Sequence, residues 1–326
     1  MDENFNIPGL VANWTFKPCT VARWERRKAI ETLWQYAHRR PLHKEIKAVT
    51  QRPTWVVFFM YAPTGVLTTS HRFTLERLRD LGLPVFVVCA TPSSDLLPQD
   101  LSAYCDALYW KGLNGYDFSA YTLALREISQ SSPGADVFVM NDSVFGPFSD
   151  LREVIAKAPW DLTGFTSSNQ VTNHIQSYAF ILRGVNKARM AKLSTVFFPY
   201  FAMSNPSAVV HVQETRLARV AARHMKVGAF WYGDRNEVID PTLVRPLALL
   251  DAGFPFLKQS LLGKHKSFID ADSVLSRLEL LGHPTDSLLV HLPARVDAAS
   301  DALTSTTLSL TVRDSVEIET VEVATA

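Results

Sequence analysis

The residues with the clearest chemical potential follow a short apolar run. Residues 137–140 are Val, Phe, Val and Met, after which the chain turns polar at Asn141, Asp142 and Ser143. A buried strand that ends in a carboxylate and two hydrogen-bonding side chains is how open α/β sheets build ligand sites at their carboxyl edge. This triplet therefore suits a phosphate, a metal ion or a sugar, unless Asp142 only caps the turn that follows.

Three more polar groups stand at or just beyond the ends of expected strands. They are Asn114-Gly115-Tyr116-Asp117, His174-Ile175-Gln176-Ser177-Tyr178 and Gln213-Glu214. Asp117 would cap the helix that it opens, and Gly115 would let a ligand approach the backbone closely. Taken singly, each group also has a structural explanation. Together on one sheet edge, they would form a polar cleft able to bind a phosphorylated sugar.

Several common catalytic signatures are absent from the sequence. It contains no GxGxxG or GxxxxGK[ST] fingerprint and no GxSxG elbow. Dinucleotide binding, a P-loop and a serine hydrolase therefore have no support from motifs. The nine histidines form no HExxH pair, and the three cysteines lie far apart. A histidine-built metal site, a zinc site and a disulfide framework are not expected.

The elements that would position these side chains alternate between strand and helix. Strands are expected at residues 55–61, 83–90, 107–110 and 136–140, with helices at 70–80 and 118–130. Such alternation implies parallel pairing with right-handed crossovers. In the second half, strands are expected at 162–165 and 177–182 around a polar loop, and helices at 210–224 and 248–254.

The composition is that of an ordinary globular protein. Of 326 residues, 47% are hydrophobic and 20% charged, and the net charge of +1 gives no reason to expect nucleic acid. No apolar run is long enough to span a membrane, which takes about 18 residues. The first residues lack the pattern of a signal peptide. We therefore expect a soluble, cytoplasmic protein, consistent with the scattered cysteines.

The N-terminal residues differ in charge from the rest. Residues 17–52 hold ten Lys or Arg and only three Glu. A helix expected over 24–38 carries Trp24 and Trp34. It could lie on an anionic membrane surface, or it could pack its aromatic side on the neighbouring domain, which we favour because its apolar face is short. Residues from about 298 onward read as a mobile tail, although 306–312 could add an edge strand.

Several ordered blocks make the chain resemble the rhamnan synthesis F family of bacterial polysaccharide glycosyltransferases. The blocks are Gly115-Tyr-Asp-Phe-Ser-Ala-Tyr121, Met140-Asn-Asp-Ser-Val-Phe-Gly-Pro147, Asp161-Leu-Thr-Gly-Phe165, His174-Ile-Gln-Ser-Tyr178, Gln213-Glu214 and Pro255-Phe-Leu-Lys258. The resemblance covers roughly residues 55–262. The loop at 62–65 departs from it, because it lacks the acidic residue expected for contact with a nucleotide.

The resemblance implies an α/β, GT-A-like fold with a mostly parallel central sheet flanked by helices. Residues 1–52 would form a basic helical extension and 291–326 a flexible tail. The domain at 53–290 would divide into a nucleotide-binding half (53–150) and an acceptor half (151–290). The implied activity is transfer of a deoxyhexose, typically rhamnose, from a nucleoside diphosphate donor to a growing cell-surface polysaccharide or O-antigen.

Site roles follow from the same resemblance. The expected donor-binding residues are Tyr61, Asp117, Asn141, Asp142, Ser143 and Lys258. The expected acceptor-binding residues are His174, Gln176, Ser177 and Tyr178. Glu214 would be the catalytic base, with Asp161 as second choice. Asp142 would hold a divalent cation, Mg²⁺ or Mn²⁺, against the diphosphate.

The implied partners are a nucleotide sugar and a lipid-linked glycan acceptor, with peripheral contact at the inner face of the cytoplasmic membrane through the basic helix. Two other readings stay open. A non-catalytic sugar-binding or scaffold subunit of a polysaccharide assembly complex would keep the cleft without needing Glu214. A metal-dependent phosphodiesterase could use Asp142, although such enzymes usually gather several carboxylates and histidines around two metals.

Overall fold

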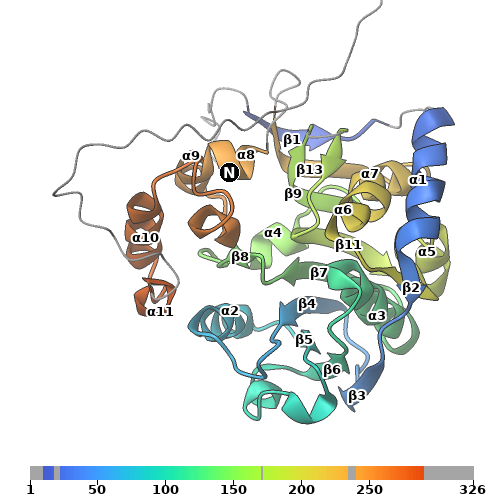
Figure 1. The fold of residues 1–326 in the computed structure, drawn as a ribbon, viewed down its shortest axis with the longest axis horizontal. Coiled ribbons are helices and arrows are strands. Elements are labelled where there is room, and N and C mark those ends of the chain that lie inside the picture. Colours follow the sequence, from blue (N-terminus) through green and yellow to red (C-terminus); the bar gives the residue numbers. More distant parts are fainter. Residues whose placement is uncertain (1–9, 18–22, 170–171, 234–239, 290–326) are drawn as a thin grey trace, which may run out of the picture. The chain divides into compact units, whose positions relative to one another are not determined.

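The computed structural model describes residues 10–17, 23–169, 172–233 and 240–289 (Figure 1). The tail expected at 291–326 lies outside these residues. Within them, ten strands form one mixed sheet, with β10 joined through β9. In spatial order the main path is β1 (Leu10–Thr15), β13 (Val227–Gly233), β9 (Leu162–Ser168), β11 (Ala179–Val185), β7 (Ala135–Asn141), β4 (Thr54–Tyr61), β5 (Val85–Ala90), β6 (Ala107–Lys111) and β3 (His43–Lys47).

The centre of the sheet is parallel. Strand β4 pairs in parallel with β5 and β7, and β5 does so with β6. Strand β11 runs antiparallel to both β7 and β9. Its first residues therefore lie at the edge where the parallel strands end. The prediction was a GT-A-like α/β fold with a mostly parallel central sheet flanked by helices. The structure confirms the α/β class, the parallel pairing at the centre of the sheet and the flanking helices.

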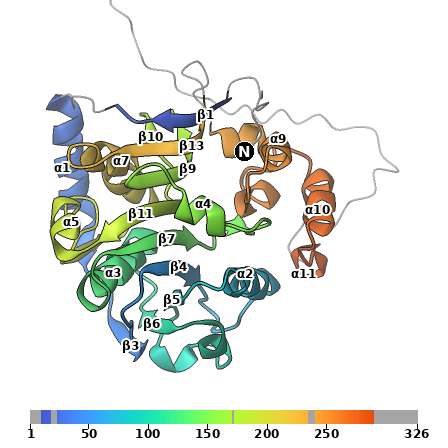
Figure 2. The same ribbon diagram turned by 180° about the vertical axis from the view of Figure 1, so that it is seen from behind.

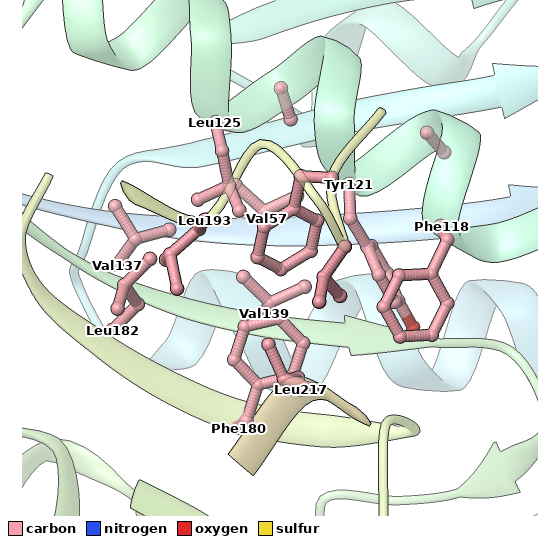
Figure 3. Close-up of a cluster of buried hydrophobic side chains, with 14 of the residues drawn as sticks. Val57, Phe118, Tyr121, Leu125, Val137, Val139, Phe180, Leu182, Leu193 and Leu217 are labelled. Atoms are coloured by element: carbon pink, nitrogen blue, oxygen red, sulfur yellow. The ribbon is translucent and has the colours of Figure 1, made fainter. Parts of the chain in front are cut away.

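Helices cover both faces of the sheet (Figures 1 and 2). One face packs against α3 (Tyr116–Ser131), α5 (Lys187–Lys192) and α7 (Thr215–Ala221), and the other against α2 (Thr69–Asp80), α4 (Arg152–Ala156) and α9 (Pro246–Asp251). Successive side chains of β4 alternate between the two cores. Val57 joins the α3 side (Figure 3), and Phe58 joins the α2 side. Burial on both faces explains why these strands are continuously apolar.

The remaining elements are short or lie beside the sheet. Strand β10 (His174–Ile175) extends the edge of β9, β2 (Ala37–Arg39) pairs with β12 (Phe201–Met203), and β8 (Val144–Phe145) pairs with β14 (Leu257–Lys258). The other helices are α1 (Arg23–Tyr36), α6 (Pro206–Val209), α8 (Pro241–Val244), α10 (Ala271–Leu280) and α11 (Asp286–Leu289). Three 3₁₀ turns lie at Ser94–Leu96, Leu101–Tyr104 and Gln259–Leu262. No helix among the described residues is both long and apolar enough to cross a membrane.

Two strands from the expected N-terminal extension are part of the central sheet. Strand β1 pairs with β13 at one edge, and β3 pairs with β6 at the other. Between them, α1 buries none of its residues fully. Trp24 is 66% exposed and Trp34 86% exposed. Its two tryptophans therefore do not provide the aromatic packing that we expected, whereas Ala29, Leu33 and Tyr36 of this helix pack against the core.

Candidate active site

The polar side chains gather at the carboxyl edge of the parallel strands. Tyr61, Lys111 and Asn141 are the last residues of β4, β6 and β7. Ala179, which begins β11, stands opposite Met140 near the end of β7. The segment that precedes β11, with His174 to Tyr178, therefore reaches the same edge. This is the position that open α/β sheets use for ligands.

Asp142 ties the end of β4 to α2. One oxygen of its carboxylate, Oδ2, accepts a hydrogen bond from the backbone N–H of Tyr61 at 2.6 Å and lies 3.2 Å from His71 Nε2. The other ring nitrogen of His71 accepts from the N–H of Thr68, so Nε2 carries the proton that it donates to Asp142. The Asp142 side chain is 18% exposed, so it is accessible from solvent.

Asn141, rather than Asp142, caps the turn after β7. Its Oδ1 accepts from the backbone N–H of Ser143 at 3.1 Å and from the Ser143 hydroxyl at 2.6 Å. Its amide Nδ2 donates to Asp117 Oδ2 at 3.1 Å. The local turn is thus satisfied by the amide, and the neighbouring carboxylate of Asp142 is left for the contacts that cross between elements.

The start of α3 presents Asp117 to this edge. Gly115, which precedes the helix, has a φ of 90°, and a Cβ there would lie 2.8 Å from both Ala202 Cβ and Ser119 Oγ. Tyr116 is also left-handed, with a φ of 51°, a conformation that costs a non-glycine residue about 1 kcal/mol or more. Two left-handed residues in succession turn the chain sharply, so that Asp117 faces Asn141.

The carboxyl of Asp117 is held in an environment that favours its neutral form. Burial raises its pKa to about 7, and the negative charge of Glu214 adds to the rise. Hydrogen bonds from Phe118 N–H and Asn141 act in the opposite direction. Asp117 as a whole residue is partly exposed. Its carboxyl group is therefore desolvated by the protein atoms packed around it, although the residue is not fully enclosed.

Glu214 ends a π-helical segment, Val210–Glu214, that leads into α7. The single helix expected over 210–224 is therefore divided, and π-helical turns of this kind often occur at functional sites. Ser177 donates to Glu214 Oε2 from its N–H at 3.0 Å and from its hydroxyl. His174 Nε2 lies 3.8 Å from Oε1, while its Nδ1 bonds to the carbonyl of Thr172. The Glu214 side chain is 20% exposed.

Gln176 and Tyr178 turn into the protein. Both contact the hydroxyl of Thr166 at 2.5 Å, and both residues are at most 5% exposed. Gln176 Nε2 donates to Asp240 Oδ2 at 2.5 Å, and Lys258 Nζ lies 2.6 Å from the same oxygen. These side chains form a buried polar network beneath the edge. The charge of Lys258 is already paired within it.

The structure does not bring Asp161 to this edge. Asp161 precedes β9, at the end of the strand opposite to the site, where it pairs with Arg189 and accepts from Lys226 N–H. The other expected residues fall into four groups of contacts: Tyr61 with Asp142, Asn141 with Asp117 and Ser143, Glu214 with Ser177 and His174, and Lys258 with Tyr178 and, through Asp240, Gln176. Lys111 is an addition that the sequence did not single out. It is 1% exposed, it donates to the carbonyls of Gly112 and Asn114, and burial lowers its pKa to about 8, against the attraction of Asp117.

The side chains available as metal ligands decide which kind of metal site fits. Among the described residues, no three His, Cys, Asp or Glu side chains are grouped as metal ligands. An all-protein cage therefore does not fit. A partly exposed carboxylate such as Asp142 does fit the alternative, since Mg²⁺ is usually bound by one or two carboxylates together with waters and substrate phosphates.

The sequence matches a known family over most of its length. The model of rhamnan synthesis protein F matches residues 85–294. This confirms the resemblance read from the motifs, although the match begins further along the chain. The virulence protein VirA of Vibrio anguillarum is 32% identical over 117 residues, which are 35% of this chain and 38% of that protein. The match thus spans less than two fifths of this curated relative.

Two solved structures that match this chain share little sequence with it. The 4-diphosphocytidyl-2C-methyl-D-erythritol synthase of Anaerococcus prevotii is 12% identical, with a TM-score of 0.36 over 56% of this chain and 91% of its own. The mannosyltransferase PcManGT of Pyrobaculum calidifontis, solved with GDP-Man and Mn²⁺, is 12% identical, with a TM-score of 0.28 over 82% of this chain and 85% of its own.

Proposed function

Because this chain belongs to the rhamnan synthesis protein F family, we propose that it is a nucleotide-sugar-dependent glycosyltransferase. In this proposal it transfers a deoxyhexose, rhamnose, from a nucleoside diphosphate donor to a growing cell-surface polysaccharide or O-antigen. The observation that carries the proposal is a set of three carboxyl groups held at the carboxyl edge of the sheet: Asp117 by Asn141, Glu214 by Ser177, and the partly exposed Asp142 by the N–H of Tyr61.

The donor would lie over the ends of β4 and β7. Tyr61, which is 47% exposed, offers an aromatic surface next to Asp142. Asp117 and Ser143 would bond hydroxyl groups of the donor, and Asn141 would keep Asp117 in place through its amide. At neutral pH, Asp117 is poised between its neutral and charged forms, so it can either donate or accept such a bond.

Glu214 would act as the catalytic base. In a direct displacement, a carboxylate takes the proton of the acceptor hydroxyl as that oxygen attacks the anomeric carbon and the nucleoside diphosphate departs. Ser177 fixes one oxygen of Glu214. The 3.8 Å between His174 and the other oxygen exceeds a direct hydrogen bond, and an acceptor hydroxyl would approach there.

The acceptor-binding residues divide into two kinds. His174 and Ser177, which are 4% and 3% exposed, lie next to Glu214 and would act on the acceptor by positioning this base. Gln176 and Tyr178 are buried in the network with Asp240, so we propose that they support the shape of this wall without touching sugar. Lys258 belongs to the same network. Because its charge is neutralised by Asp240, we do not assign it to the diphosphate.

Asp142 would hold a divalent cation, Mg²⁺ or Mn²⁺, together with the diphosphate of the donor. A bound cation would offset the negative charge that develops on the leaving group. The hydrogen bonds from Tyr61 N–H and His71 fix the orientation of the Asp142 carboxylate beforehand. The remaining oxygen ligands would come from phosphate and water.

We also propose a cytoplasmic location with peripheral contact at the membrane that carries a lipid-linked acceptor. The support is the exposed face of α1, where Trp34 and basic side chains meet solvent, as in helices that lie at bilayer surfaces. Removal of the N-terminal residues would also remove β1 and β3 from the sheet. Substitution of Trp34→Ser, with co-sedimentation on anionic vesicles, is therefore the cleaner test, and undiminished sedimentation would contradict the contact.

The experiment that tests the activity is incubation with a panel of nucleotide sugars and Mg²⁺ or Mn²⁺, followed by measurement of nucleoside diphosphate release. Release that depends on a glycan acceptor supports the transferase. Donor binding without turnover would instead indicate a sugar-binding or scaffold subunit. Hydrolysis of many unrelated nucleotides without an acceptor would indicate a phosphodiesterase.

A further inference from the structure

Side chains of α1 and α7 line a groove. These two helices lie on the opposite side of the sheet from α2 (Figure 1). Its volume is about 530 Å³, within the range of small-molecule sites. Both walls are helical. Trp24 lines it from α1, and Val220 lines it from α7.

The groove is strongly cationic. Five basic side chains line it, and Glu25 is the only carboxylate among the described residues that does so. The basic side chains are Arg26, Lys28, Arg216, Arg219 and Arg223. Glu25 is paired with Arg219 at 2.8 Å. Within the described part of the chain, Arg26, Lys28 and Arg223 form no ion pair, so no described carboxylate balances their charge.

This arrangement has an electrostatic cost in the absence of an anion. Arg216, Arg219 and Arg223 are spaced three and four residues apart, which places them on one face of the helical segment. Burial, together with the charges of Arg219 and Arg223, lowers the pKa of Arg216. Like charges at such spacing repel one another, and a bound anion would reverse the sign of that interaction.

We propose that this groove binds a phosphate or diphosphate ester group of the acceptor. The inference rests on the proposed transferase function and names the part of the acceptor that is recognised. The groove adjoins the candidate base, since His211 and Thr215 line it and Glu214 lies between them in sequence. Thr172 also lines it, and its carbonyl accepts from His174, which faces Glu214.

The recessed position of two of the five basic side chains favours a small anion over a flat lipid surface. The Arg219 side chain is only 9% exposed, and Arg216 is partly buried. A bilayer surface would reach exposed side chains on the outer face of α1. A phosphate group can instead enter the groove and accept hydrogen bonds from guanidinium groups through two of its oxygens. Arginine is suited to this task because its planar fork matches phosphate geometry.

The test is fluorine NMR of the intact protein labelled with 5-fluorotryptophan, with the Trp24 resonance assigned through Trp24→Phe. Inorganic pyrophosphate is the probe, because a response at Trp24 reports the groove and not the donor site. We expect a saturable shift in the unaltered protein. In Arg216→Gln/Arg223→Gln, half-saturation should need at least tenfold more pyrophosphate. The matched control Lys157→Gln/Lys192→Gln removes two exposed charges elsewhere and should respond as the unaltered protein does.

Two further arms keep the outcome decisive. If the arginine variant fails to fold, Arg26→Gln/Lys28→Gln removes two charges from the exposed helix α1 and should show the same weakening. Vesicles of phosphatidylcholine with or without phosphatidylglycerol replace pyrophosphate in the second arm. A Trp24 response to anionic vesicles but not to pyrophosphate would overturn the proposal in favour of a membrane contact, and an equal pyrophosphate response in all variants would overturn it outright.

These outcomes are separable from those of the transferase proposal. Donor turnover without any pyrophosphate response at Trp24 would remove the groove inference and leave the activity standing. A groove response in a protein that neither binds nor turns over any nucleotide sugar would remove the activity instead.

Discussion

Asp117 and Glu214 come from segments nearly a hundred residues apart, yet the charge of Glu214 raises the pKa of Asp117 in addition to the effect of burial. Asp117 is positioned by two left-handed residues before α3. Glu214 is positioned by a π-helical segment and by Ser177. A carboxyl group whose pKa is raised by burial and by a neighbouring carboxylate is a common feature of sites for acid–base chemistry.

The raised pKa of Asp117 predicts a specific pH dependence of stability. In the unfolded chain this group ionises near its ordinary value of 3.8, whereas in the folded protein it does so at about 7. Between these values the folded state binds the extra proton, so the free energy of unfolding falls as pH rises. The amide of Asp117→Asn does not ionise, so the variant does not lose stability in this way as pH rises. From pH 5 to pH 7.5, its stability relative to the unaltered protein should increase by about 2 to 3 kcal/mol.

Urea denaturation at the two pH values measures this change. Asp80→Asn, at an exposed position on α2, serves as the control and should show a far smaller pH-dependent difference. The absolute stability of Asp117→Asn will also reflect altered bonds with Asn141, so the comparison is between pH values. A stability difference that stays constant across this range would rule out the raised pKa.

The sequence predicted the edge of the sheet better than the roles of individual residues. Asn141-Asp142-Ser143 does follow a buried central strand, and Asp117 does open a helix. The sequence could not show that Asn141 would cap the turn while Asp142 contacts Tyr61 and His71. Either side chain can cap a turn, and the choice depends on partners from elements distant in the chain.

Two residues show where a stricter use of strand direction would have helped. Asp161 precedes its strand, and ligand sites in such sheets lie at the carboxyl ends, so its place at the opposite edge could have been inferred. Lys111 directly follows the run expected as a strand at 107–110, and its position at the edge could also have been inferred. Asp240 gave no signal, because its contacts with Gln176 and Lys258 bridge distant segments.

Glu214→Gln should reduce turnover while leaving the donor site intact. The amide keeps the shape of the side chain but cannot take a proton, and loss of a general base typically slows a reaction by about 10²- to 10⁴-fold. The turnover number for acceptor-dependent nucleoside diphosphate release should fall within that range, with donor affinity changed by less than about threefold. Glu76→Gln, on the exposed side of α2, is the control.

Equal losses of donor affinity and turnover in Glu214→Gln would instead mean that Glu214 binds the donor. Unchanged turnover would exclude Glu214 as the base. Circular dichroism of both variants checks that the fold is retained, which matters because Ser177 donates to this carboxylate.

Asp142→Ala should weaken donor binding and the response to Mg²⁺ or Mn²⁺ together. The carboxylate accepts hydrogen bonds from Tyr61 N–H and His71, so its removal should also cost about 1–3 kcal/mol of stability, and circular dichroism checks that the variant is folded. Isothermal titration with the donor identified by the panel, with and without EDTA, measures both effects. We expect EDTA to weaken binding to the unaltered protein at least tenfold, about 1.4 kcal/mol, and to have little effect on Asp142→Ala.

Asp100→Ala, which removes an exposed carboxylate paired with Arg72, is the matched control for that comparison. Its donor binding and its EDTA response should equal those of the unaltered protein. An EDTA effect of full size in Asp142→Ala would show that Asp142 does not hold the cation, and the absence of any EDTA effect in the unaltered protein would exclude the cation itself.

Lys258 and Asp240 provide a test of the buried network independent of any substrate. Asp240 is 3% exposed. Burial alone would raise its pKa, but Lys258 and the hydrogen bonds from Thr242 and Gln176 hold it below its ordinary value. Lys258→Met leaves that carboxylate without its counter-charge. Removal of one partner from a buried pair typically costs about 3–5 kcal/mol, and we expect a loss of that size in the free energy of unfolding from urea denaturation at pH 7.

The double variant Lys258→Met/Asp240→Asn removes both charges and should recover part of this loss, because no unpaired ion stays buried. The sign of the pH dependence provides a second criterion. A carboxyl group whose pKa is lowered in the folded protein stabilises the fold above its ordinary pKa of 3.8, and this stabilisation is lost as pH falls. The cost of Lys258→Met should therefore shrink in acid. A double variant no more stable than the single one, at a cost that does not change with pH, would mean that Lys258 does not stabilise the fold through its ion pair with Asp240.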